Sequence, residues 1–162
     1  MFPNKTKIFT IFTSLGYGGA GNPPSKLSTN DELLKILEDK CKDIEFIVRD
    51  VSKGDKLSSI VTELYDIRDD LDGVLIIGSS REYRLALTGL PTIVVYNLFE
   101  FMLIPYELYI QNGRILFSCI DRRYTVKEDV FNKMIDELVE KLNLIKVLKK
   151  DEIIQGLSYY TV

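Results

Sequence analysis

A glycine-rich segment near the start of the chain has the residue types of a phosphate-binding turn. Gly16, Gly18 and Gly21 follow the spacing G-x-G-x-x-G, in which backbone N–H groups approach a pyrophosphate and a following helix N-terminus stabilises its charge. Pro23-Pro24 separates these glycines from the next helix-like stretch, so that helix begins too late to hold a diphosphate. We therefore interpret the segment as a mobile lid that presents N–H groups to a polar ligand, although a plain flexible loop at a strand end would have the same composition. Its predicted ligand-binding residues are Gly16, Tyr17, Gly18 and Gly19.

Polar residues also follow two later apolar runs. Ser79, Ser80 and Arg81 come after a run that ends at Ile77, and Asn97 follows a second run. Small hydroxyls, free N–H groups and an arginine suit an anionic or polyhydroxy ligand. The alternative is that the two serines only cap the next helix.

The carboxylates Asp50, Glu100 and Asp121 also follow apolar runs. An acid at the end of the second strand can bind a ribose hydroxyl. Asp50 therefore supports the alternative function, a nucleotide- or flavin-binding protein that takes NAD or FMN. If the three carboxylates converged, they could hold a divalent metal. The chain contains no histidine, which excludes Ser-His-Asp and Cys-His catalysis within it and histidine-ligated zinc. Cys41 and Cys119 form no CxxC motif, and we interpret them as reduced, partly buried thiols.

The elements that must position these residues alternate between strands and helices. Short β-rich runs with the composition of strands buried on both faces, alternating with amphipathic stretches, predict a parallel sheet covered by helices. We therefore predict a three-layer α/β domain with about five strands, of flavodoxin-like or Rossmann-like type. The predicted strands are Ile8–Leu15, Ile44–Asp50, Val74–Ile77, Thr92–Tyr96 and Ile115–Ile120.

Helix signals fill the gaps between the strands. Thr29, with Glu32 three residues later, predicts a capping box at the first helix. A short helix is predicted at 81–87, and Leu144–Leu148 is either a helix extension or another strand. Apolar spacing predicts a second helix through Leu57, Ile60, Val61, Leu64 and Ile67, and a last helix from about Lys127 whose apolar face carries Val130, Phe131, Met134, Ile135, Leu138 and Leu142.

Strand order decides whether the polar strand ends meet. In the order 2-1-3-4-5, the loops after the first and third strands line one crevice at the carboxyl edge, where ligands bind in such sheets. An aromatic segment after the fourth strand is too apolar for a short loop, and we predict that it packs against another subunit or domain, the alternative being ordinary core. Its predicted interface residues are Phe99, Phe101, Met102, Tyr106 and Tyr109.

Composition restricts the class of protein. The 162 residues predict one domain over 1–150, with 151–162 as an arm or the start of a further domain. The net charge of −3, without a basic stripe, disfavours nucleic-acid and anionic membrane binding. No apolar run is long enough to span a bilayer and no signal-peptide pattern is present, so we expect a cytoplasmic protein. Many Ile, Lys and Glu with few Met and Cys favour a heat-adapted source.

The stretch Asp72–Tyr124 resembles the first domain of the L-fucose and L-arabinose isomerase group of sugar isomerases. "DGVLIIGSS" and "GLPTIVVYN" are strands with polar ends, "FMLIPYELY" is an aromatic, proline-bearing crossover, and "GRILFSCIDRR" is a strand that ends in basic residues. The resemblance implies a flavodoxin-like domain that serves oligomer assembly and helps to close a neighbouring subunit's active site.

The same resemblance implies that isomerisation itself uses manganese, held by acidic residues and a histidine of later domains. This chain has no histidine, so we expect it not to isomerise sugars alone, to hold no cofactor itself and to contribute no catalytic residue. The implied substrate-facing positions are the loop 16–19, Ser79, Ser80 and Asn97. The resulting hypothesis is a domain that binds a sugar or sugar phosphate and forms a homo-oligomer.

Overall fold

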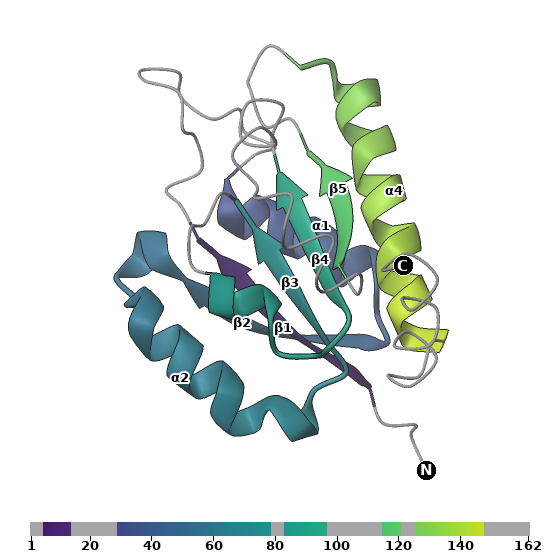
Figure 1. The fold of residues 1–162 in the computed structure, drawn as a ribbon. Coiled ribbons are helices and arrows are strands. Elements are labelled where there is room, and N and C mark those ends of the chain that lie inside the picture. The colour runs from purple at the N-terminus through teal and green to yellow at the C-terminus, as the bar shows by residue number, and fades with distance from the viewer. Residues whose placement is uncertain (1–4, 14–28, 79–82, 97–114, 121–125, 148–162) are drawn as a thin grey trace, which may run out of the picture.

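The computed structural model describes residues 5–13, 29–78, 83–96, 115–120 and 126–147 (Figure 1). Its strands are β1 (Thr6–Phe12), β2 (Ile44–Asp50), β3 (Gly73–Ile77), β4 (Thr92–Tyr96) and β5 (Ile115–Cys119). Its helices are α1 (Asn30–Lys40), α2 (Leu57–Ile67) and α4 (Glu128–Val147), with short 3₁₀ turns η1 (Val51–Lys53), η2 (Arg68–Asp70) and η3 (Tyr83–Ala86). A strand lies at each of the five predicted places, although β1 ends at Phe12 and β5 at Cys119, and residues 14 and 15 of the first predicted strand lie outside the described residues. Within the predicted short helix at 81–87, residues 83–86 form the 3₁₀ turn η3.

The five strands form one sheet in the order β2-β1-β3-β4-β5, and every neighbouring pair runs parallel. Helix α2 covers one face of this sheet, and α1 and α4 cover the other (Figure 1). The described residues therefore have the three-layer, flavodoxin-like α/β fold that the sequence predicts.

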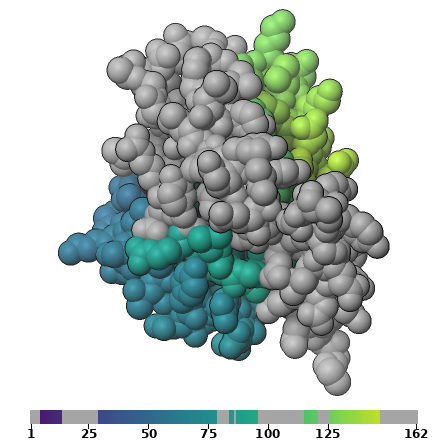
Figure 2. Space-filling model, in the orientation of Figure 1, coloured from purple at the N-terminus to yellow at the C-terminus, as the bar shows by residue number. Residues whose placement is uncertain are grey.

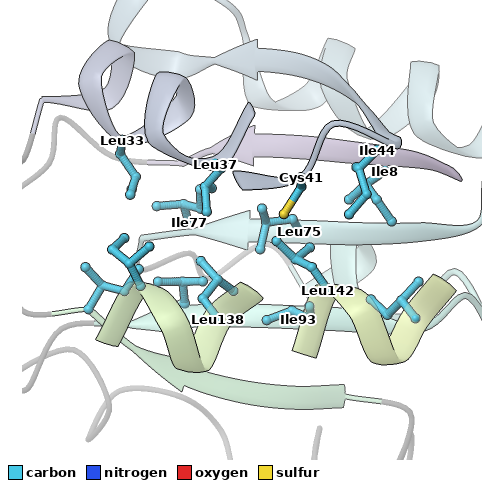
Figure 3. Close-up of a cluster of buried hydrophobic side chains, with 14 of the residues drawn as sticks. Ile8, Leu33, Leu37, Cys41, Ile44, Leu75, Ile77, Ile93, Leu138 and Leu142 are labelled. Carbon is cyan, nitrogen blue, oxygen red and sulfur yellow. The ribbon is translucent and has the colours of Figure 1, made fainter. Parts of the chain in front are cut away.

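Side chains of the central strands alternate between two apolar clusters. In β3, Leu75 and Ile77 pack beneath α1 and α4, whereas Val74 and Ile76 face α2. Figure 3 shows the first cluster, in which Leu33 and Leu37 of α1 and Leu138 and Leu142 of α4 point toward the sheet. A strand buried on both faces has no position for a charge, which explains the uncharged runs in the sequence.

Helix α2 lies beside the connection between β3 and β4. The hydroxyl of Tyr65 donates a hydrogen bond to the carbonyl of Arg84 in η3 at 2.8 Å, and Arg68 donates to the carbonyl of Thr88 at 3.2 Å. In Figure 2 the surfaces of α2 (blue) and of the η3 region (teal) lie side by side, apart from α4 (green to yellow). These contacts fix α2 to the second half of the sheet.

Helix α4 continues to Val147, so the Leu144–Leu148 stretch is a helix extension as far as the structure describes it. Ile145 extends the buried face, and a Cβ placed on Gly73 would lie 3.1 Å from its Cγ2 atom. The prediction that Val130 belongs to this face is wrong, because its side chain is 47% exposed. At about 100° per residue, Phe131 takes the buried position and turns Val130 outward.

One buried hydroxyl in the sheet lacks a hydrogen bond. Ser118 of β5 is 3% exposed, and its Oγ atom has no hydrogen-bond partner. It lies opposite Val95 of β4 in the strand register. The hydroxyl of Thr92, also buried, instead donates to the carbonyl of Leu90 at 2.9 Å. The two hydroxyls therefore have opposite expected effects on stability.

We predict that Ser118→Ala raises the free energy of unfolding by about 1 kcal/mol, because it removes a buried polar group that makes no hydrogen bond. Thr92→Val keeps the shape of the side chain but removes a satisfied donor, so it should lower the same free energy by about 1 kcal/mol. Urea denaturation of both variants checks the pair. A loss of stability in Ser118→Ala similar to that in Thr92→Val would contradict the prediction.

Candidate functional site

Hydrogen bonds just beyond the strands connect the carboxyl ends of β1, β3 and β4. Beyond β1, the N–H group of Thr13 donates to the carbonyl of Ile77 at 3.0 Å, and the Thr13 hydroxyl reaches the same oxygen at 3.3 Å. Beyond β3, the N–H group of Gly78 donates to the carbonyl of Val95 at 3.0 Å. The chain therefore leaves β1, β3 and β4 at adjacent points of one edge.

The order in which strands are added to the sheet changes side at this edge. The connection through α1 leads from β1 to β2 on one side, whereas β3 continues to β4 and β5 on the other. Strands β1 and β3 thus flank the topological switch point, the usual ligand position in an open parallel sheet. Gly78 has φ +108°, a conformation that side chains strongly disfavour, so the turn out of β3 requires glycine.

The predicted ligand-binding and interface residues lie outside the residues that the structure describes. The ligand-binding positions are Gly16, Tyr17, Gly18, Gly19, Ser79, Ser80, Arg81 and Asn97, and the interface positions are Phe99, Phe101, Met102, Tyr106 and Tyr109. The described ends that lead into them are Thr13, Gly78 and Tyr96. Their roles remain predictions, and strand order places the start of the three segments on neighbouring strands.

Asp50, at the end of β2, is a buried carboxylate whose oxygens accept several hydrogen bonds. It is 4% exposed, and Oδ1 accepts from the Ser52 N–H at 2.8 Å and from the Ser52 hydroxyl. The amide of Asn30, in the first turn of α1, donates to Oδ2 at 3.2 Å and to Oδ1 at 3.4 Å. Asp50 therefore caps η1 and links β2 to α1, which is the role of a structural carboxylate.

The start of α1 is acidic, and a side chain caps one N–H group of its first turn. Thr29 caps the helix, with its hydroxyl oxygen accepting from the Glu32 N–H at 3.2 Å and its carbonyl from Leu33. The Thr29 half of the predicted capping box is confirmed, but the buried Oε2 atom of Glu32 has no hydrogen-bond partner. Lys53 bonds Asp31 at 2.6 Å, and this hydrogen bond raises the pKa of the lysine. Two acids in the first turn disfavour an anionic ligand there.

The described residues contain no group of three His, Cys, Asp or Glu side chains that could hold a metal ion. Glu100 and Asp121, the two other carboxylates of the metal hypothesis, lie outside the described ranges. Neither cysteine forms a disulfide, which agrees with the predicted thiols, and Cys41 is buried while Cys119 is half-buried. Burial, assisted by the charge of Asp43, raises the pKa of the Cys41 thiol, which disfavours its nucleophilic thiolate.

Sequence reasoning missed the contacts of three residues at this edge, Ser52, Asn30 and Thr13. The Asp50-x-Ser52 pattern carries a local signal, because aspartate accepts hydrogen bonds from N–H groups two residues later. Asn30 is separated from Asp50 by 20 residues, and no local pattern pairs them. The Thr13 contact with Ile77 likewise depends on the pairing of β1 with β3.

A scan against protein-family models found no match to this chain, and a search of curated proteins also found none. The likeness to the sugar isomerase domain is therefore still a prediction. In the described part of the chain, no helix combines the length and apolar character that crossing a membrane requires.

We predict that Asp50→Ala lowers the free energy of unfolding by about 1–3 kcal/mol, because it removes the acceptor of buried donors from Ser52 and Asn30. Asp50→Asn keeps one carbonyl oxygen and should lose less. Urea denaturation measures both variants, and Asp66→Ala on an exposed position is the control. Unchanged stability in Asp50→Ala would refute the structural role.

Proposed function

We propose that this chain is a small-ligand-binding and assembly domain, which binds a sugar-like polyhydroxy ligand at the carboxyl edge of its sheet, between β1 and β3. The observation that supports this most is the reversal of strand order between these two strands, because ligands of open parallel sheets bind at that point. The sequence adds Ser79, Ser80, Arg81 and Asn97 directly after β3 and β4, together with the lid 16–19 after β1.

A neutral ligand fits the described edge better than a phosphate. Asp31 and Glu32 lie in the first turn of α1, and Thr29 engages the N–H groups of Glu32 and Leu33. A phosphate at this helix start would meet two carboxylates, and the Glu32 N–H is already bonded to the Thr29 hydroxyl. Hydroxyl groups both donate and accept hydrogen bonds, so a polyhydroxy ligand tolerates the same acids.

The contacts of Asp50 argue against the alternative function, a nucleotide- or flavin-binding protein. Its candidate ribose acid, Asp50, is 4% exposed, and both of its oxygens accept hydrogen bonds from Asn30 or Ser52. A carboxylate so occupied has little capacity left for a ribose hydroxyl. The glycine spacing at 16–21 remains in favour of a nucleotide, so the binding experiment includes nucleotides.

We expect neutral pentoses and hexoses to raise the thermal midpoint of the chain, and NAD, FMN and ATP to leave it unchanged. At a ligand concentration 100 times Kd, the stabilisation is about 2.7 kcal/mol. Thermal denaturation against a panel of sugars, sugar phosphates and nucleotides tests this directly. A shift with nucleotides alone would establish the alternative, and no shift with any of these compounds would refute the ligand-binding proposal.

Variants can then locate the binding site. Ser79→Ala and Asn97→Ala should weaken sugar binding by several-fold each, since each removes one hydrogen-bonding group. Ser59→Ala, on an exposed position of α2, is the matched control. Isothermal titration calorimetry measures the three affinities. Equal affinities in all three variants would show that the ligand does not bind at the ends of β3 and β4.

For assembly, we propose that the aromatic segment from Phe99 to Tyr109 packs against a second copy of the chain. Its concentration of aromatic side chains is typical of an interface core. We expect Phe101→Ser with Tyr106→Ser to shift the chain toward the monomer in sedimentation experiments. Val130→Ser, at an exposed apolar position of α4, is the control. A wild-type chain that is monomeric at high concentration would refute the assembly part of the proposal.

A further inference from the structure

Strand β2 is an edge strand of the sheet. It pairs with β1 along one edge, and no described strand pairs with its other edge. Its middle residues, Phe46, Ile47 and Val48, are apolar, β-prone and only half-buried. A free, apolar edge of this kind is a ready template for pairing with another chain. The contacts of this edge therefore determine whether the chain associates through it.

The ladder with β1 shows which peptide groups of β2 point outward. The Thr6 N–H donates to the carbonyl of Asp43 at 3.1 Å. Because alternate residues of a parallel strand bond to the same neighbour, positions 43, 45, 47 and 49 face β1. The peptide groups of Ile44, Phe46, Val48 and Asp50 face away from the sheet.

Two charged side chains bond outward-facing groups at the carboxyl half of this edge. Arg49 donates from Nη1 to the carbonyl of Val48 at 2.7 Å. Asp55 accepts the N–H of Asp50 at 2.9 Å through Oδ2. At the other end of the strand, the N–H of Ile44 donates to the carbonyl of Cys41 at 3.2 Å. A strand added at this edge would have to displace these bonds.

Arg49 is fixed in this position by its other contacts. Its Nε donates to Oε2 of Glu63 on α2 at 2.9 Å, and its Nη2 pairs with the other oxygen of that carboxylate. Its guanidinium carbon lies 5.9 Å from the centre of the Phe9 ring. The hydrogen bond with Glu63 also raises the pKa of the arginine. A bidentate, half-buried pair is better ordered than an isolated surface charge.

We propose that Arg49 and Asp55 close the edge of β2 against a strand of a second copy of this chain, so that any self-association runs through another surface. A pairing strand needs a run of outward N–H and C=O groups. The described contacts engage one outward group on each side of Phe46 and one further along: the Ile44 N–H before it, and the Val48 carbonyl and the Asp50 N–H beyond it. An added strand would therefore find only short stretches of this edge open around Phe46. This inference is independent of the proposed ligand and of the aromatic segment.

The test is the double variant Arg49→Val with Asp55→Ala, compared with the full wild-type chain over a concentration series by analytical ultracentrifugation. We expect the variant to form larger species than the wild type, with slower hydrogen exchange across residues 44–50 as concentration rises. Lys133→Val with Glu137→Ala, at exposed positions of α4, is the charge-matched control, because it leaves the contacts of Arg49 and Asp55 intact. A folded double variant that sediments like the wild type at every concentration would overturn the proposal.

Asp55→Ala alone keeps the test decisive if the double variant does not fold, because Asp55 is an exposed residue between η1 and α2. In this variant the backbone N–H of Asp50 should exchange its hydrogen about five- to tenfold faster than in the wild type, as expected for one lost hydrogen bond. A labelled peptide with the sequence of residues 44–50 should then bind this variant more tightly than the wild type, measured by fluorescence anisotropy. Faster exchange without any gain in peptide binding would overturn the proposal.

Discussion

The parallel pairing of β1 with β3 is the contact around which the other elements are arranged. It extends from Ile8 opposite Gly73 to Phe12 opposite Ile77. At its amino end, Lys7 and Asp72 exchange hydrogen bonds, with the Lys7 N–H donating to Asp72 Oδ2 at 2.8 Å and the Asp72 N–H to the Lys7 carbonyl at 2.9 Å. Both strands are apolar on both faces, so helices must cover each side of the sheet. Because the chain extends away from this pair in two directions, the same contact also creates the switch point.

The two ends of this pair have different chemistry. At the amino end, Gly73 provides close packing, since a Cβ there would lie 3.1 Å from both Ile8 and Ile145. At the carboxyl end, Gly78 provides a turn with positive φ. The buried polar contacts of Thr13 and Asp50 gather at this second end. The structure therefore separates a tightly packed edge from an edge where the chain turns and where we propose the ligand site.

Much of the fold could be predicted from local patterns. Five short β-rich runs became strands, and the spacing of apolar residues predicted α2 and most of α4. The errors and omissions came from contacts between distant segments. Val130 fits the helical pattern, but Phe131 takes the position against the sheet. Asn30 has no sequence signal for its bond to Asp50, and Arg49 none for its pair with Glu63 across 14 residues. The predicted ligand-binding residues follow from polarity at strand ends, and strand order is what brings those ends together.

By itself, the sequence determined the kind and the succession of elements, because burial on two faces requires uncharged strands and a buried helix face requires apolar residues three and four positions apart. It also determined the absence of histidine and hence of histidine chemistry. Only the tertiary structure decided that β1 and β3 are neighbours and that β2 is an edge strand of the sheet. It also decided that the Asp50 carboxylate accepts hydrogen bonds from Asn30 and Ser52. The reason is physical: strand order and side-chain hydrogen bonds depend on which distant segments pack together, and periodicity along the chain contains no information about that packing.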